Sequence, residues 1–110
     1  MVSMREIRKL GRRIGEAFRP RRVILFGSYA YGTATEDSDV DLLVILPFRG
    51  GSMREAARRS VEIRLRTRPS FAVDLIVRTP GKVRQRLSMG DCFIREILEK
   101  GKVLYEAPRT

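Results

Sequence analysis

Three short apolar runs constrain the fold of this chain more than any other feature of its sequence. They occupy residues 23–26, 39–46 and 71–77. Their length and their Val, Ile and Leu content are typical of strands, and amphipathic segments of helical period separate them. Strands separated by helices predict an α+β fold of the α/β type, with a small mixed sheet of three to four strands flanked by helices.

Four helices are expected around this sheet. The first spans residues 3–18, the second follows an N-cap at Ser52, the third starts at Thr79-Pro80, and the fourth lies between Asp91 and Gly101. We expect the second helix to bury an apolar face made of Met53, Ala56, Ala57, Val61 and Leu65. A short helix or turn follows Ser28, and residues 102–105 form a short edge strand.

Length and composition indicate one globular domain over residues 1–110. The 12.6 kDa chain is 43% hydrophobic and 33% charged, which are ordinary globular values. No apolar run approaches the roughly 18 residues of a membrane span. A single cysteine, Cys92, excludes an internal disulfide and is expected to be a small buried hydrophobe. We therefore expect a cytoplasmic protein without a membrane segment.

The chain has no histidine, and this absence excludes several chemistries. Ser-His-Asp and Cys-His nucleophile systems and histidine zinc sites cannot be built. Oxygen ligands remain, and these select hard cations such as Mg²⁺ or Mn²⁺. The net charge of +10 indicates an anionic partner, while residues 36–41 hold four acids and no base. An acidic spot in a basic body suits a metal–nucleotide complex at least as well as a nucleic acid.

Three acids and a glycine turn form the candidate site. Side chains alternate along a strand, so Asp39 and Asp41 point the same way, about 7 Å apart. Asp74 lies in the third apolar run, where an unpartnered carboxylate would be costly to bury; pairing with Arg68 or Arg78 is the alternative to a cation. The Gly27-Ser28 turn is either an ordinary turn or a phosphate-binding turn with a hydroxyl donor. The sequence has no G-x-x-x-x-G-K-[ST] motif, so this is not a P-loop.

The combination G-S-x-x-x-G, then S-D-x-D-L-x-V, then a single Asp in a later strand resembles the nucleotidyltransferase superfamily that contains the DNA polymerase beta palm. The likeness covers roughly residues 20–78. The small size looks most like the minimal nucleotidyltransferases (MNT), which are partners of HEPN-domain proteins. The resemblance implies the nucleotidyltransferase, polymerase beta palm-like fold.

The resemblance also implies an activity: magnesium-dependent transfer of AMP from ATP to a hydroxyl. Asp39 and Asp41 would bridge two Mg²⁺ ions, and Asp74 would hold the ion that activates the acceptor. Gly27 and Ser28 would grip the β and γ phosphates.

Three further positions follow from the same resemblance. Gly32 would let the following helix pack. Ser38 would cap or orient the acid pair, with a plain turn serine as the alternative. Tyr31 departs from the pattern, because many such proteins have a basic residue there, and the phosphate contact would then be absent or supplied by another arginine.

Three functions are consistent with this sequence. The one we favour is an antitoxin that adenylylates a tyrosine of a HEPN-type RNase toxin encoded nearby, because the chain has no residues left for an acceptor-binding domain. A non-catalytic binding module of the same fold is the second, and nucleotide transfer to RNA ends or to an antibiotic is the third. Self-association into a homo-oligomer is left open.

Overall fold

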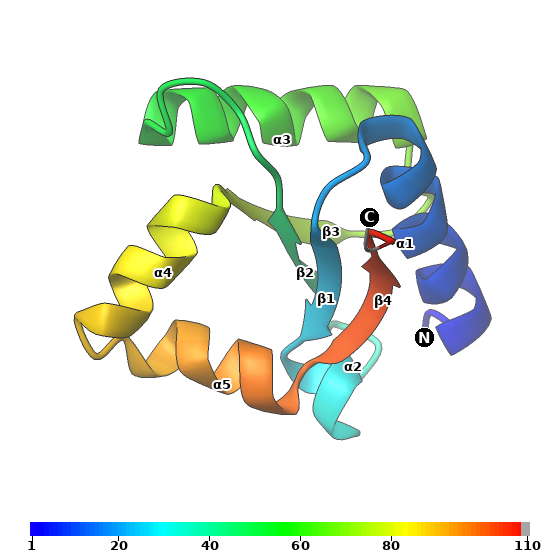
Figure 1. Ribbon diagram of the computed structural model, residues 1–110. Helices are drawn as coiled ribbons and strands as arrows, with labels where there is room; N and C mark the ends of the chain where they lie inside the picture. The colour runs from blue at the N-terminus through cyan, green and yellow to red at the C-terminus, as the bar shows by residue number, and fades with distance from the viewer. Residues whose placement is uncertain (109–110) are drawn as a thin grey trace.

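The computed structural model describes residues 1–108 and confirms the predicted class of fold, a four-stranded mixed sheet flanked by helices (Figure 1). The elements in chain order are α1 (Met4–Phe18), β1 (Arg22–Phe26), α2 (Ser28–Tyr31), β2 (Val40–Ile45), α3 (Met53–Thr67), β3 (Val73–Arg78), α4 (Pro80–Ser88), α5 (Cys92–Lys100) and β4 (Lys102–Glu106). Every element expected from the sequence is present, with ends that differ by one or two residues.

The strand order brings the site-bearing ends of three strands together. The sheet runs β3-β2-β1-β4, with β1 antiparallel to both β2 and β4, and β2 parallel to β3. Because β2 and β3 are parallel, they begin at the same end of the sheet. Because β1 is antiparallel to β2, it ends there, and the turn at Gly27 lies beside the first residues of β2.

The two faces of the sheet carry separate hydrophobic cores. On one face α1 and α3 cover Val23 and Leu25 of β1 and Val40, Leu42 and Val44 of β2. On the other face α4 and α5 cover Ile24, Phe26, Leu43 and Ile45. Figure 1 shows these helix pairs on opposite sides of the strands. The odd residues of β2 therefore face α4 and α5, and Asp41 is the first of them.

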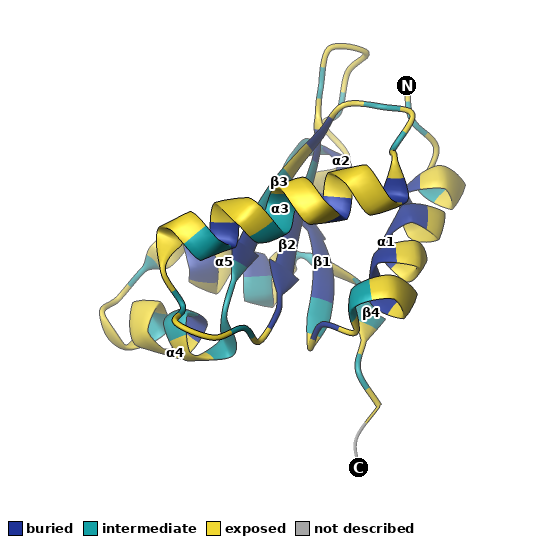
Figure 2. Cartoon of the chain, turned by 90° about the horizontal axis from the view of Figure 1, so that it is seen from above, coloured by how far each residue is buried: buried dark blue, intermediate teal, exposed yellow. Residues whose placement is uncertain are grey.

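Helix α3 packs against the sheet with a different face from the one expected. Its buried residues are Ala56, Ile63 and Thr67, whereas Met53, Val61 and Leu65 are more than half exposed. Figure 2 shows the exposed side of α3 turned away from the strands. The error arose because two apolar stripes lie along this helix, and the smaller side chains of the buried stripe allow closer approach to the sheet.

Three helix termini agree with the capping residues read from the sequence, Ser52, Thr79 and Asp91, whereas Ser3, expected inside the first helix, is its N-cap. Ser3, Ser52, Thr79 and Asp91 each accept a backbone hydrogen bond from the third residue of the following helix. Cys92 is exposed rather than buried, because it is the first residue of α5 and lies on its outer side. None of the helices within residues 1–108 is long and apolar enough to cross a membrane.

Two glycines of α1 let β4 close the sheet. A Cβ on Gly11 would lie 2.6 Å from the Leu104 Cβ, and a Cβ on Gly15 would run into the Tyr105 ring. Leu104 and Tyr105 both reach α1 because the pairing of β4 with β1 shifts register between Val23 and Ile24. The helix backbone thus lies directly on the bulge.

We predict that Gly15→Ala lowers the free energy of unfolding by about 1–3 kcal/mol, because the added methyl overlaps the Tyr105 ring. This loss outweighs the roughly 1 kcal/mol by which alanine favours a helix over glycine. Gly81→Ala in α4 is the matched control, since nothing lies closer to its Cβ than Arg84 at 3.8 Å. We expect it to gain roughly 0.4–1 kcal/mol. Chemical denaturation measures both, and equal shifts of one sign would contradict the packing of α1 on β4.

Candidate active site

Asp41 lies at the centre of the candidate site because β2 is paired on both sides. Its register partners are Phe26, the last residue of β1, and Asp74 in β3. Register partners share a sheet face, so the Asp41 and Asp74 side chains stand side by side on the face covered by α4 and α5. Asp39 precedes β2 by one residue. The structure therefore brings the three predicted acids to one end of the sheet.

The expectation that Asp74 is buried is wrong. It is exposed, and within residues 1–108 it forms no ion pair with Arg68, Arg78 or any other base. The reason is that β3 is an edge strand with one open side. Desolvation therefore does not demand a partner for Asp74, and the cost of the acid cluster falls on its neighbour Asp41.

Asp41 carries the electrostatic cost of the site. Burial raises the pKa of its carboxyl group above the usual range, and the charges of Asp74 and then Asp39 raise it further. No ion pair within residues 1–108 involves any of the three acids. A cation between these carboxylates would remove their repulsion, so the cluster has the polarity of a cation site.

Two features require glycine at position 27: the backbone conformation there and the closeness of Asp41. Its φ of 74° and ψ of −158° fall in a region that only glycine adopts readily. A Cβ there would run into the Asp41 carboxylate. The backbone of the turn thus passes directly beside the central acid.

The turn continues into α2, whose first amides point out of the helix. The N–H groups of Ala30 and Tyr31 donate to the Gly27 carbonyl at 3.0 and 3.1 Å, whereas those of Ser28 and Tyr29 come too early for an acceptor within the helix. With the Ser28 hydroxyl they form a set of donors for an anion such as a phosphate.

Gly32 has a different role from the one expected. Nothing lies within 4 Å of a Cβ built on it, and no helix follows it before β2, so the expected packing role is wrong. Its φ of 80° ends α2 in the left-handed conformation, and its N–H donates to the Ser28 carbonyl. Gly32 therefore shapes the end of the short helix that follows the Gly27 turn.

Ser38 is bonded within its own turn. Its hydroxyl accepts from the Thr35 N–H at 2.8 Å, and its own N–H donates to the Thr35 carbonyl at 3.1 Å. This is the turn-serine alternative rather than a direct contact to the acids. The turn fixes the chain immediately before Asp39.

Tyr31, the last residue of α2, supplies a neutral hydroxyl beside the Gly27 turn. Burial raises the pKa of its phenol and the charge of Glu96 raises it further, while a hydrogen bond with the Gly27 backbone acts in the opposite direction. The side chain therefore stays uncharged at neutral pH and contributes hydrogen bonding but no positive charge to the turn.

The donor set fits a divalent cation only together with a ligand. Within residues 1–108, no group of three or more His, Cys, Asp or Glu side chains is arranged so that it could hold a metal ion. Mg²⁺ in phosphoryl-transfer sites is commonly held by one or two carboxylates plus substrate phosphates, with water completing its shell. The protein's part of such a site would be the adjacent carboxylates, which repel each other, beside the donors of the Gly27 turn.

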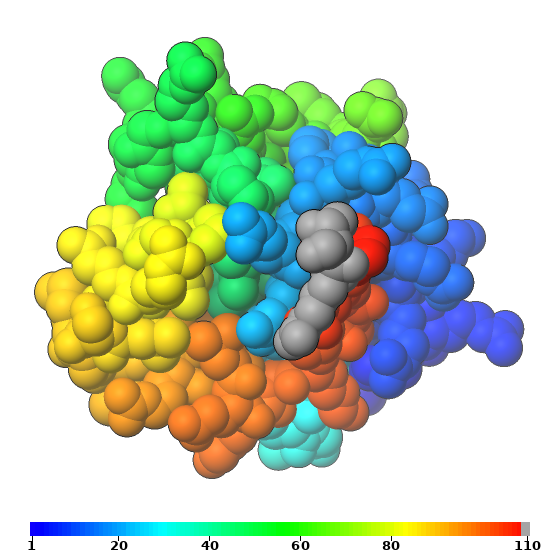
Figure 3. Space-filling model, in the orientation of Figure 1, coloured from blue at the N-terminus to red at the C-terminus, as the bar shows by residue number. Residues whose placement is uncertain are grey.

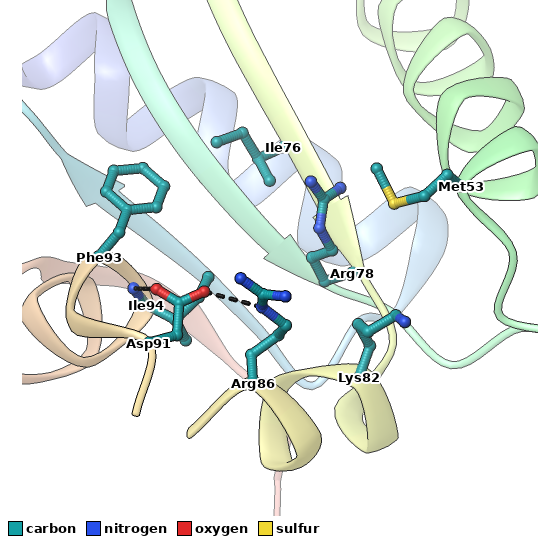
Figure 4. A pocket seen from close by; sticks show the side chains of 8 residues that line it. All are labelled: Met53, Ile76, Arg78, Lys82, Arg86, Asp91, Phe93 and Ile94. Carbon is teal, nitrogen blue, oxygen red and sulfur yellow. Dashed lines mark hydrogen bonds and ion pairs between the residues drawn. The ribbon is translucent and has the colours of Figure 1, made fainter. Parts of the chain in front are cut away.

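The sequence did not predict that Phe93, Arg78 and Lys82 line a hollow next to the acids. Phe93 of α5 is 51% exposed, and its ring meets Phe26 edge-on, with centroids 5.6 Å apart. Figure 4 shows Phe93 among the side chains that line a hollow, together with Arg78 and Lys82. The two-residue alternation of Asp74, Ile76 and Arg78 was the signal that could have placed Arg78 on the acidic face.

The chain is similar to known proteins in both sequence and fold. Residues 7–105 match the family described as "Nucleotidyltransferase domain". The chain is 31% identical over 87 residues to the "putative protein adenylyltransferase" of Methanocaldococcus jannaschii, covering 79% of this chain and 80% of that protein.

Two solved structures have the same fold. A "putative nucleotidyltransferase" from Sulfolobus solfataricus superposes with a TM-score of 0.62 at 15% identity, over 94% of this chain and 79% of that one. A crystal structure described as a toxin-antitoxin with AMP-PNP superposes with a TM-score of 0.56 at 20% identity, over 96% and 75% of the two chains. At these identities the likeness establishes the fold.

We predict that Gly27→Ala destabilises the protein by about 2 kcal/mol or more, since it combines a glycine-only conformation with a clash against Asp41. Gly32→Ala, also at positive φ but in open space, should cost about 1 kcal/mol. In a double-mutant cycle, Asp41→Ala should recover part of the loss in Gly27→Ala and none in Gly32→Ala. Additive effects of Gly27→Ala and Asp41→Ala would contradict the contact.

We predict that Asp41→Asn stabilises the protein without ligands at neutral pH, by about 0.2–1 kcal/mol, because it removes a like charge opposite Asp74. The folded-state pKa of Asp41 is raised, so its ionised form costs stability above that pKa. The cost disappears as the pH falls through the folded-state pKa towards the ordinary aspartate range, and the two proteins should then unfold alike.

Thermal unfolding as a function of pH measures this difference. Asp37→Asn makes the same change of charge in the exposed loop before β2 and should leave the midpoint unchanged. A variant with Asp41→Asn that is less stable than wild type at pH 7 would show that the carboxylate is compensated within the protein.

Proposed function

The chain belongs to the nucleotidyltransferase domain family, and from this membership we propose that it transfers AMP from Mg-ATP to a tyrosine hydroxyl of a HEPN-type toxin and thereby acts as its antitoxin. The observation that carries the proposal is the position of Asp41. Its carboxylate lies against the Gly27 turn on one side and beside Asp74 on the other. A phosphate chain and an acceptor can approach the same cation site from opposite sides.

The relatives support the choice of reaction and partner. The Methanocaldococcus jannaschii relative is described as a "putative protein adenylyltransferase", and its match covers about four-fifths of both chains. The toxin-antitoxin structure with AMP-PNP joins this fold to an ATP analogue and to a toxin-antitoxin setting.

Each part of the site has a task in this reaction. Asp39, Asp41 and Asp74 would hold Mg²⁺, with two ions our expectation. When bound, the cations neutralise the charge on the reacting phosphates. The free amides of α2 and the Ser28 hydroxyl bind the β and γ phosphates, and the uncharged Tyr31 hydroxyl adds hydrogen bonding there.

The order of the strands determines from which side each substrate approaches the acids. Phosphates held at the end of β1 leave the space over Asp74 for the acceptor. The acceptor oxygen forms a bond to the α phosphorus, the bond from that phosphorus to the bridging oxygen breaks, and pyrophosphate leaves on the Gly27 side. The proton of the hydroxyl is released to solvent. Positioning and charge neutralisation lower the barrier without a covalent intermediate on the protein.

We predict that the purified protein adds the mass of AMP to the protein encoded by the adjacent gene when ATP and Mg²⁺ are present. Asp41→Asn should lower the rate on the order of 10²–10³-fold, because several kcal/mol of transition-state stabilisation depend on the cation site. Removing Mg²⁺ with EDTA should abolish the transfer, while Asp37→Asn should react like wild type. Intact-mass spectrometry measures the product.

The same experiment separates the proposal from its alternatives. Absence of any mass gain with wild-type protein would overturn adenylylation of this partner. Full neutralisation of the toxin by a variant with Asp39, Asp41 and Asp74 all changed to Asn would instead identify a binding module.

A further inference from the structure

A basic hollow adjoins the acids on the open side of the sheet. It has a volume of about 390 Å³ and lies between β3, the start of α3, α4 and α5, with Met53, Ile76, Arg78, Lys82, Arg86 and Phe93 in its wall. Figure 4 shows Arg78, Lys82 and Arg86 around it. A second hollow of about 220 Å³ shares Met53, Ile76 and Arg78 and continues along β3 beneath α3. We call the two together the β3 groove.

The groove starts where the candidate active site ends. Asp74, Ile76 and Arg78 alternate along β3 and share the face that carries Asp41. From the rise of a strand, Ile76 lies about 7 Å and Arg78 about 13 Å beyond Asp74. A chain whose reactive hydroxyl sits at Asp74 would place side chains about two to four residues away over Arg78 and Lys82.

The outer edge of β3 can accept an extended chain. The Ala72 carbonyl accepts from the N–H of Val40 at 3.0 Å, and the Arg78 carbonyl from that of Leu46, just after β2, at 2.9 Å. Alternation therefore directs the backbone groups of residues 73, 75 and 77 to the open edge. The Arg78 guanidinium donates to the Val77 carbonyl at 2.8 Å and covers part of this edge. Beside it Ala57 and Ser60 of α3 are small and leave room.

The charge of the groove favours an acidic occupant. Three bases, Arg78, Lys82 and Arg86, face one acid, Asp91, which leaves two positive charges in excess. The Asp91 carboxylate forms an ion pair with Arg86 Nε at 2.9 Å, and it accepts a hydrogen bond from the Ile94 N–H at 3.0 Å because it caps α5. Within residues 1–108 neither Arg78 nor Lys82 has an ion-pair partner. The start of α3 and α4 border each other on the surface, with a notch between them (Figure 3).

We propose that the β3 groove binds the acceptor protein through an extended segment with acidic residues about two to four positions from the modified hydroxyl. This inference rests on the proposed function, because it places the acceptor on the Asp74 side of the acids. The apolar wall of Met53, Ile76 and Phe93 suits a polypeptide better than an RNA backbone. The phosphates of the nucleotide are assigned to the other end of the site, at Gly27.

The test uses two synthetic peptides and does not depend on transfer alone. Each carries a fluorescent label and one tyrosine, flanked on both sides by glutamates in one peptide and by lysines in the other. Binding to the full chain is measured by anisotropy, and AMP transfer from Mg-ATP by mass. We expect the glutamate peptide to bind about tenfold or more tightly than the lysine peptide, with an affinity that falls as salt rises.

Variants identify the groove as the source of this preference. Arg78→Glu with Lys82→Glu should reverse the preference between the peptides. Arg78→Gln with Lys82→Gln should abolish it with less risk to the fold, which thermal unfolding checks. Arg5→Glu with Arg12→Glu changes the net charge equally on the exposed side of α1 and should leave the preference intact.

The outcomes separate this inference from the proposed function. Equal binding of both peptides by wild type, or a preference that survives the groove variants, overturns the acidic acceptor segment. If only the groove variants lose affinity for Mg-ATP, the groove binds the nucleotide and the inference is overturned. If the groove binds a single-stranded RNA in preference to both peptides, the groove is an RNA site and the inference is also overturned. Groove-dependent binding of the glutamate peptide without any AMP transfer supports the groove and counts against the adenylyltransferase.

Discussion

The repulsion around the Asp41 carboxylate is the physical constraint on which the rest of the site depends. Asp41 is fixed on two sides, by Phe26 of β1 and by Asp74 of β3, so it cannot turn away from its neighbours. Burial and two like charges raise the pKa of its carboxyl group. A fold selected for stability alone would place an apolar side chain here, as β2 does further along the same face at Leu43. The Asp41 carboxylate therefore lowers the stability of the protein without ligands, and this cost is a reason for proposing a cation site here.

The sheet pairing divides the two sides of the proposed reaction between different strands. The phosphate side belongs to β1, an interior strand whose turn is held by the glycine conformation at Gly27. The acceptor side belongs to β3, an edge strand with an open backbone. A rigid phosphate site suits a small ligand that is always the same, whereas an open edge suits a protein segment that must enter and leave. Helix α4 and helix α5 then supply the charge and the aromatic ring beside that edge.

Local patterns predicted the elements well because each has a local cause. Capping by Ser52 and Asp91 depends on neighbours within three residues, and the alternation of Asp39 and Asp41 follows from strand geometry alone. The wrong predictions concern how the elements pack against one another. The burial of Asp74 depends on whether β3 is interior or at an edge, and the buried face of α3 depends on which stripe meets the sheet. No short segment of the sequence determines the order of the strands or the rotation of α3 about its axis.

The charge distribution gives the remaining argument for an anionic nucleotide with its metal. A chain with a net charge of +10 attracts polyanions at long range, yet its candidate site is a cluster of carboxylates that would repel them at contact. A polyanion without bound cations would therefore be attracted by the protein as a whole and repelled by the carboxylates of the site. A triphosphate that arrives with divalent cations satisfies both, because the field of the whole protein acts on its net negative charge while its cations meet the acids. In the proposed function the basic surface and the acidic cluster would act on the same metal–nucleotide complex, and the β3 groove would extend the basic surface to the acceptor.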